Sequence, residues 1–162
     1  MEYKIKNTKI SIDTISKYLG IKKDTITAKP KMVSIYKDTE LIISVSDLSV
    51  LKDLKPNINK YSKLCKQLGV TGISIFTNQT FIKNNSLHTR EFAPLYGYLE
   101  DPLCGLAAGA IAKYLQSSGV KGKLKIEQGN FIKSPGLIEV LPSKFGFYIG
   151  GNYVIKSKTW KV

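Results

Sequence analysis

Histidine, arginine and cysteine are almost missing from this 162-residue chain, which has one histidine, one arginine and two cysteines. Cys65 and Cys104 are too few and too far apart for a zinc finger or a disulfide framework, so we expect free thiols in a reducing compartment and neither metal nor cofactor. The longest apolar run, residues 103–112, is too short to cross a bilayer. These absences predict a cytoplasmic protein that makes no membrane contact.

The chain is strongly basic, with 25 basic and 12 acidic residues and a formal net charge of +13. Such an excess can indicate a polyanionic partner. All but one of the basic residues are lysine, however, and they are dispersed along the chain rather than clustered. Proteins that recognise a nucleotide sequence favour arginine, whose guanidinium group donates two hydrogen bonds to one base. No nucleic-acid-binding motif is present in this sequence. We therefore expect a solvated basic surface and no nucleic-acid partner.

Length and composition are those of one ordinary globular domain, which we assign to residues 1–162. Hydrophobic residues make up 43% and charged residues 23% of the chain, which excludes global disorder. Helical spacing and capping residues predict short helices over 12–19, 48–54 and 58–68. Strand patterns lie at 32–36, 40–45, 72–76, around Phe81, and at 87–93, 124–128, 137–141, 145–149 and 153–156. This mixture predicts the α+β class.

One further helix differs from the others because it is apolar on all sides. Asp101 is a preferred N-cap and Pro102 suits the first helical position, so the helix is predicted to begin there. Between Asp101 and Ser118 the only other charged residue is Lys113. A helix that is apolar all round is a buried one. We therefore predict a curved mixed sheet wrapped around one buried central helix.

The start of this helix is the candidate functional site. Free N–H groups and the helix dipole favour an anion there, so a substrate carboxylate would bind well. The same field would favour the thiolate of Cys104 in the first turn. In the simpler interpretation, Asp101 is only a cap and Cys104 only a small core residue. Cys65 lies on the apolar face of its own helix and is predicted to be a core thiol.

Several motifs resemble the C-terminal half of the PhzF (phenazine-biosynthesis-like) family. They are Arg90-Glu91-Phe92-Ala93-Pro94, Glu100-Asp101-Pro102, Gly105 with Ala107-Ala108-Gly109-Ala110, Gln128-Gly129, Pro135-Gly136-Leu137-Ile138-Glu139-Val140 and Gly150-Gly151. The resemblance implies half of a diaminopimelate-epimerase-like fold, whose two halves each wrap a sheet around a central helix. The active site of that fold lies between the two helix N-termini.

The resemblance also implies roles for single residues. Asp101 would line the substrate pocket, beside Glu100 of the same motif, and the Gly105 backbone would bind substrate. Leu106 occupies the position of a pocket serine in the family. Cys104 resembles the acid/base thiol of related epimerases and racemases. Asp101 and Cys104 are therefore the candidate catalytic residues, and Glu100, Gly105 and Leu106 the candidate substrate-binding residues.

The implied activity is an isomerase or epimerase that moves a proton next to the carboxylate of a small molecule. The family's catalytic glutamate belongs to the other half, so a second chain or a second copy would have to complete the site. A homodimer is expected, joined through a strand at 158–162 or through an apolar face around Leu95, Tyr96, Tyr98 and Leu106. The alternative is a catalytically inactive PhzF-like binding or structural domain.

Overall fold

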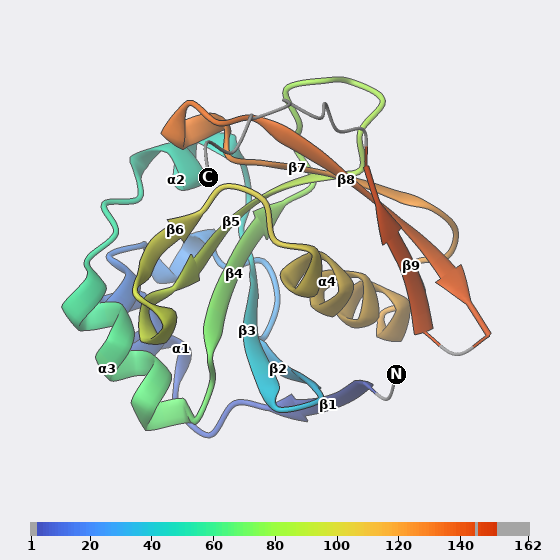
Figure 1. Cartoon of the computed structure of the whole chain (residues 1–162). Coiled ribbons are helices and arrows are strands. Elements are labelled where there is room, and N and C mark those ends of the chain that lie inside the picture. The colour runs from blue at the N-terminus through green and yellow to red at the C-terminus, as the bar shows by residue number, and fades with distance from the viewer. Residues whose placement is uncertain (1–2, 145, 152–162) are drawn as a thin grey trace, which may run out of the picture.

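A computed structural model describes residues 3–144 and 146–151, whose strands form one nine-stranded sheet (Figure 1). The strands are β1 Tyr3–Asn7, β2 Lys31–Ile35, β3 Asp38–Ser44, β4 Gly72–Thr77, β5 Leu87–Ala93, β6 Tyr98–Asp101, β7 Leu124–Gln128, β8 Gly136–Ser143 and β9 Gly146–Gly150. Their order is β1-β2-β3-β4-β5-β7-β8-β9, and β6 pairs with β5 beside this path.

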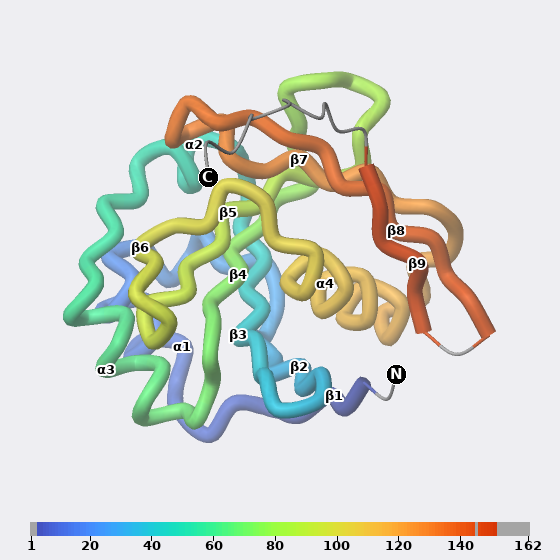
Figure 2. Tube along the Cα trace, viewed as in Figure 1, coloured from blue at the N-terminus to red at the C-terminus, as the bar shows by residue number. Residues whose placement is uncertain are grey.

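The sheet is mixed and curled, as expected of an α+β half-barrel. The β3–β4 and β5–β7 pairs are parallel, and the other strand pairs among the described residues are antiparallel. Figure 2 shows β5 and β7 side by side although β6 and a helix separate them along the chain. The crossover between these two strands therefore carries the candidate site.

Three helices lie against one face of the sheet: α1 Ile12–Leu19, α2 Leu48–Asp53 and α3 Ile58–Leu68. Their N-caps are Ser11, Asp47 and Asn57, each of which accepts a backbone N–H with its side chain. Gly20 and Gly69 end α1 and α3 in the left-handed conformation, at positive φ, which glycine adopts without strain. Short 3-10 turns occur at Lys23–Thr25, Pro94–Tyr96 and Asn130–Ile132.

The first of two cores lies between these three helices and the sheet. It buries Ile15, Leu19, Met32, Leu41, Ile43, Val45, Leu51, Leu54, Tyr61, Leu64, Cys65, Val70, Ile73, Ile75 and Phe92. The Cys65 thiol is fully buried in it, which confirms that this cysteine belongs to the core. Apolar residues at alternate positions of β3 and β4 point into this core.

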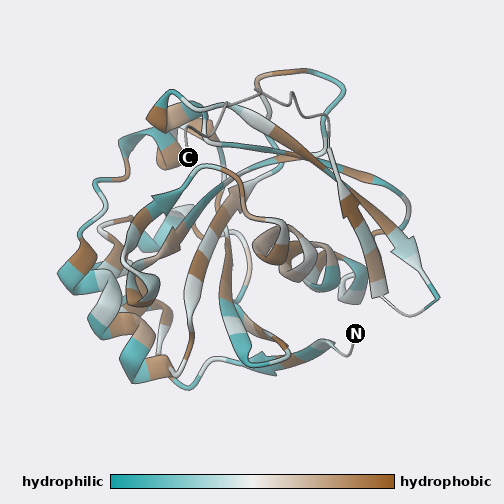
Figure 3. Cartoon of the chain, viewed as in Figure 1, coloured by the Kyte–Doolittle hydropathy of each residue, from teal (hydrophilic) through white to brown (hydrophobic). Residues whose placement is uncertain are grey.

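The second core lies on the opposite face, where helix α4 Gly105–Ser117 packs against the sheet. Six consecutive residues of α4, at 107–112, are buried, and α4 contacts β1, β2, β3, β4, β8 and β9. Figure 3 shows apolar residues along the middle strands and on the first turn of α4. Gly109 permits this close packing, since a Cβ there would lie 2.9 Å from the Tyr3 hydroxyl.

One sequence prediction about strands is wrong. The segment around Phe81 is a loop, because the Glu127 carboxylate accepts the N–H groups of Phe81 and Ile82 at 2.8 Å each. Two observed strands were not predicted: β1, and β6, which pairs with β5. The expected strands at 153–156 and 158–162 lie outside the described residues.

Within the described part of the chain, no helix combines the length and the apolar character that crossing a bilayer requires.

Candidate functional site at the start of α4

The turn from β6 into α4 differs from the predicted helix start. Helix α4 begins at Gly105 with Cys104 as its N-cap, so the prediction that Asp101 caps the helix is wrong. Asp101 instead ends β6, where it pairs with Glu91 of β5. Its Oδ1 accepts the N–H of Leu103 at 3.0 Å and so stabilises the turn that leads to the helix.

A single buried side chain, that of Gln128 at the end of β7, holds this turn in place. Its Nε2 donates to the Asp101 carbonyl oxygen at 2.7 Å, and its Oε1 accepts the N–H of Cys104 at 3.3 Å. Gly129 follows at φ 83°, and a Cβ there would lie 2.7 Å from the Pro102 carbonyl oxygen. The close approach of the turn to β7 therefore requires glycine at this position.

Cys104 is half-buried, and its thiol behaves differently from the prediction. Its Sγ accepts the N–H of Ala107 at 3.5 Å, which favours the thiolate as the helix field was expected to do. Burial and the nearby Glu91 carboxyl outweigh this bond and raise the pKa of Cys104 to about 12. The expectation of a favoured thiolate is therefore wrong, and Cys104 is a protonated thiol at neutral pH.

Two N–H groups remain open at the start of α4. The first N–H groups of any helix lack intrahelical acceptors. Those of Cys104 and Ala107 are bound by Gln128 and by Cys104 Sγ, whereas those of Gly105 and Leu106 have no acceptor among the described residues. The Leu106 side chain packs against the second core. Backbone donors at Gly105 and Leu106 are suited to a carboxylate oxygen.

The Glu100 carboxylate forms an ion pair with Arg90, on the face of β6 opposite to Asp101. Arg90 donates Nε and Nη2 to the two Glu100 carboxylate oxygens at 2.9 and 2.5 Å, and both side chains are more than nine-tenths buried. Arg90 Nη1 also donates to the carbonyl oxygens of Leu51 and Leu54. The pair therefore anchors β6 to the sheet and to α2.

Sequence reasoning missed the polar residues of the sheet beside this turn. Glu40 of β3 and Glu91 of β5 are buried charged residues on either side of β4, and Ser74 and Gln128 are fully buried polar ones. The sequence does show a glutamate in each of two segments whose apolar pattern otherwise predicts a buried strand. No pattern in a single sequence shows that Glu40 and Glu91, 51 positions apart, face one another.

Apolar side chains are exposed on the surface next to the turn. Leu95, Tyr96, Tyr98, Leu99 and Leu103 keep between 41% and 61% of their surface exposed. They belong to the segment that runs through β6 to the start of α4. Leu106, which we expected on this face, is partly buried in the second core instead. We call these five exposed residues the β6 apolar surface.

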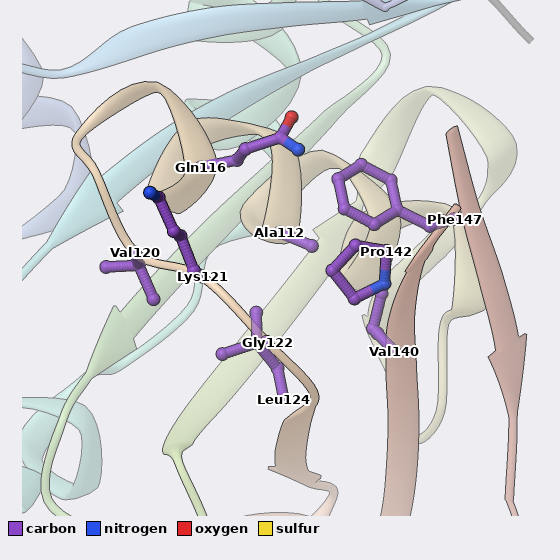
Figure 4. Close-up of a pocket in the computed structure, with 9 residues that line it drawn as sticks. All are labelled: Ala112, Gln116, Val120, Lys121, Gly122, Leu124, Val140, Pro142 and Phe147. Atoms are coloured by element: carbon purple, nitrogen blue, oxygen red, sulfur yellow. The ribbon is translucent and has the colours of Figure 1, made fainter. Parts of the chain in front are cut away.

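A small hollow lies at the other end of α4, away from the turn (Figure 4). It has a volume of about 120 Å³ and its lining is mostly apolar: Ala112, Gln116, Val120, Lys121, Gly122, Leu124, Val140, Pro142 and Phe147. None of the sequence-predicted site residues lines it, so it is separate from the candidate site.

The fold resembles several solved structures. The chain superposes on a Bacillus anthracis protein of the PhzF family with a TM-score of 0.75 and 21% identity, covering 91% of this chain and 53% of that one. A predicted epimerase from Pseudomonas aeruginosa gives a TM-score of 0.68 at 19% identity, covering 91% of this chain and 50% of the other.

The sequence itself decides the family. The model of the phenazine biosynthesis-like family, PhzC-PhzF, matches residues 4–155. The chain belongs to this family. Uncharacterized isomerases of Deinococcus radiodurans and Clostridium acetobutylicum are 33% and 32% identical over 106 and 108 residues, or 62% and 63% of this chain. Those alignments cover only 33% and 36% of the relatives, and this PhzF-like chain spans about half of each solved structure.

Proposed function

We propose that this chain supplies one half of a PhzF-like isomerase or epimerase. The reaction moves a proton on the carbon next to a carboxylate of a small molecule. Family membership and the relatives described as isomerases support the reaction class. The observation that carries the proposal is the turn into α4, where Asp101 and the N-cap Cys104 come just before the open N–H groups of Gly105 and Leu106.

In this proposal the substrate carboxylate accepts hydrogen bonds from the Gly105 and Leu106 backbone. The Asp101 carboxylate, as a proton acceptor, or the Cys104 thiol, as a proton donor, then serves one face of the reacting carbon. Cys104 suits the donor role because its raised pKa keeps the thiol protonated. Glu100 acts through Arg90, which fixes β6 and hence the position of Asp101.

The proposed site is completed by a second half that faces the start of α4. Moving a proton between the two faces of a carbon requires groups on both faces, and this turn lies on one side only. The β6 apolar surface is suited to cover by another protein surface. We propose that residues 1–162 correspond to the C-terminal half of a PhzF-like protein, with α4 as its central helix. A homodimer or a separate N-terminal-half chain in the cytoplasm would complete it.

A second candidate function is a PhzF-like binding or structural domain without turnover. It is favoured by the apolar Leu106 side chain at the position that the family resemblance assigns to a pocket serine. A leucine there offers only its backbone N–H to a ligand, so binding of a carboxylate is retained while a side-chain donor is lost.

Solvent deuterium exchange distinguishes the two functions. The chain is incubated in D₂O with a panel of L-amino acids and 2-hydroxy acids, and proton NMR follows the hydrogen next to the carboxylate. A half-enzyme that assembles with itself exchanges this hydrogen, loses exchange in Asp101→Asn, and gains in Leu106→Ser. Ligand-induced shifts of the Gly105 and Leu106 amide signals without exchange would instead support the binding domain.

A further inference from the structure

Two glutamates face one another inside the sheet, on the side that α4 covers. Glu40 of β3 is paired with Gly72 of β4, and Glu91 of β5 is paired with Ser74 of the same strand. Paired residues of neighbouring strands point to the same face. Only 4% of Glu40 and 1% of Glu91 is exposed. Two acidic side chains are thus removed from water beside a strand that carries no basic residue.

Their carboxyl groups converge over Gly72. A Cβ on this glycine would lie 2.5 and 2.6 Å from the two oxygens of Glu40 and 2.6 Å from Oε1 of Glu91. The Ser74 hydroxyl donates to the other oxygen of Glu91, Oε2. Glu40 Oε2 and Glu91 Oε1 are buried and have no donor among the described residues. One proton held between the two carboxyl groups would satisfy both oxygens.

The surroundings oppose a second negative charge. The other titratable groups that act on this pair or respond to it are Asp38, Cys65, Tyr96, Asp101 and Cys104, and none of them can carry a positive charge that would stabilise a second carboxylate. Burial raises the pKa of Glu40 to about 7, and burial together with Glu40 raises the pKa of Glu91 well above its usual range. In the described chain, no third His, Cys, Asp or Glu joins them to form a metal site.

The pair lies next to the candidate site. Glu91 is the β5 partner of Asp101, which is followed three positions later by Cys104. After burial, the Glu91 carboxyl is the largest influence that raises the pKa of the Cys104 thiol. A change in the charge of the Glu40–Glu91 pair therefore changes the pKa of the Cys104 thiol at the start of α4.

We propose that Glu40 and Glu91 form an acid pair that holds at least one proton between its carboxyl groups at neutral pH, and that negative charge on this pair opposes ionisation of the Cys104 thiol. Glu40 and Glu91 are positioning residues, since they act through Cys104. This inference goes beyond the isomerase proposal, because it concerns proton binding by the folded chain and requires neither substrate nor second half.

Carbon-13 NMR of the glutamate carboxyl carbons tests the shared proton directly in the wild-type chain. The chain has six glutamates. We expect one resonance to titrate near pH 7 and a second to titrate well above the usual glutamate range. Glu40→Gln and Glu91→Gln should each remove one of these two signals, whereas Glu139→Gln, on a partly exposed glutamate, should leave both. If all six signals titrate in the ordinary range, the acid pair does not exist.

Alkylation of Cys104 by iodoacetamide tests the effect of the pair on the thiol. This reagent is uncharged, so its rate reports the thiolate fraction without steering by charge. Mass spectrometry of the Cys104 peptide over a range of pH should give an apparent pKa above that of a free thiol. Glu91→Gln should lower it and raise the rate several-fold at mildly alkaline pH, whereas Glu139→Gln should not. An unchanged profile in folded Glu91→Gln would overturn the link to Cys104. A variant that fails to fold leaves the wild-type carbon-13 titration to decide whether the pair exists.

Discussion

Replacing Gln128 with alanine should loosen the start of α4, because this side chain joins the two ends of the turn between Asp101 and Cys104. The substitution removes one hydrogen bond at 2.7 Å and one at 3.3 Å from a fully buried position. Each bond contributes about 1 kcal/mol, and the groups left unpaired and the space left empty add to the loss. We expect the free energy of unfolding to fall by about 2–4 kcal/mol.

Urea denaturation followed by circular dichroism measures this change, with Gln116→Ala as the matched control. Gln116 is an exposed glutamine of α4 whose Oε1 accepts a hydrogen bond from Lys113 Nζ at 3.1 Å. The control should lose less than about 0.5 kcal/mol. Hydrogen exchange should also accelerate at the amide of Cys104 in Gln128→Ala. If Gln128→Ala loses no more stability than Gln116→Ala, Gln128 does not hold the turn.

Three further predictions concern the acid pair and the cysteines. Gly72→Ala should destabilise the chain by about 1–3 kcal/mol in urea, because its Cβ would overlap the carboxyl oxygens, whereas Gly105→Ala should be nearly neutral since its Cβ meets only Ile149 at 3.4 Å. The free energy of unfolding should fall as pH rises from the ordinary glutamate range through about 7, because over this range the folded chain keeps a proton on Glu40 that the unfolded chain releases. Thermal midpoints measured over the same pH range should fall less steeply in Glu40→Gln than in the wild-type chain. Equally steep curves would contradict this prediction. Cys104 should alkylate faster than Cys65 but more slowly than a free cysteine, and labelling at the free-cysteine rate would show that the Cys104 thiol is not shielded.

Local sequence signals predicted most of the helices and strands. Caps such as Asp47 and Asn57 and the glycine after α3 fixed helix boundaries within a residue or two, because capping depends on a few neighbouring residues. The strands of the two cores were predicted by their apolar patterns. Membership of the PhzF-like family was predicted from motifs around β5, β6 and α4, and the family match confirms it.

The errors arose where distant segments decide the local structure. Asp101-Pro102 has the composition of a helix start, yet pairing with β5 keeps Asp101 extended and moves the start to Cys104. The raised pKa of Cys104 depends on burial and on Glu91 in a neighbouring strand, neither of which its own sequence neighbours reveal. Phe81 is held in a loop by Glu127, which lies 46 residues away. Such long-range contacts override local preference.

Complementation tests the proposed half-enzyme most directly. The chain is mixed with the N-terminal half of the Bacillus anthracis PhzF-family protein, which is similar in fold. Exchange of the hydrogen next to the carboxylate is then followed by NMR in D₂O over the same panel of amino and hydroxy acids. We predict exchange that exceeds that of either half alone and that is lost when Asp101→Asn replaces the wild-type chain. A complex that forms by sedimentation and shows no Asp101-dependent exchange would contradict the account.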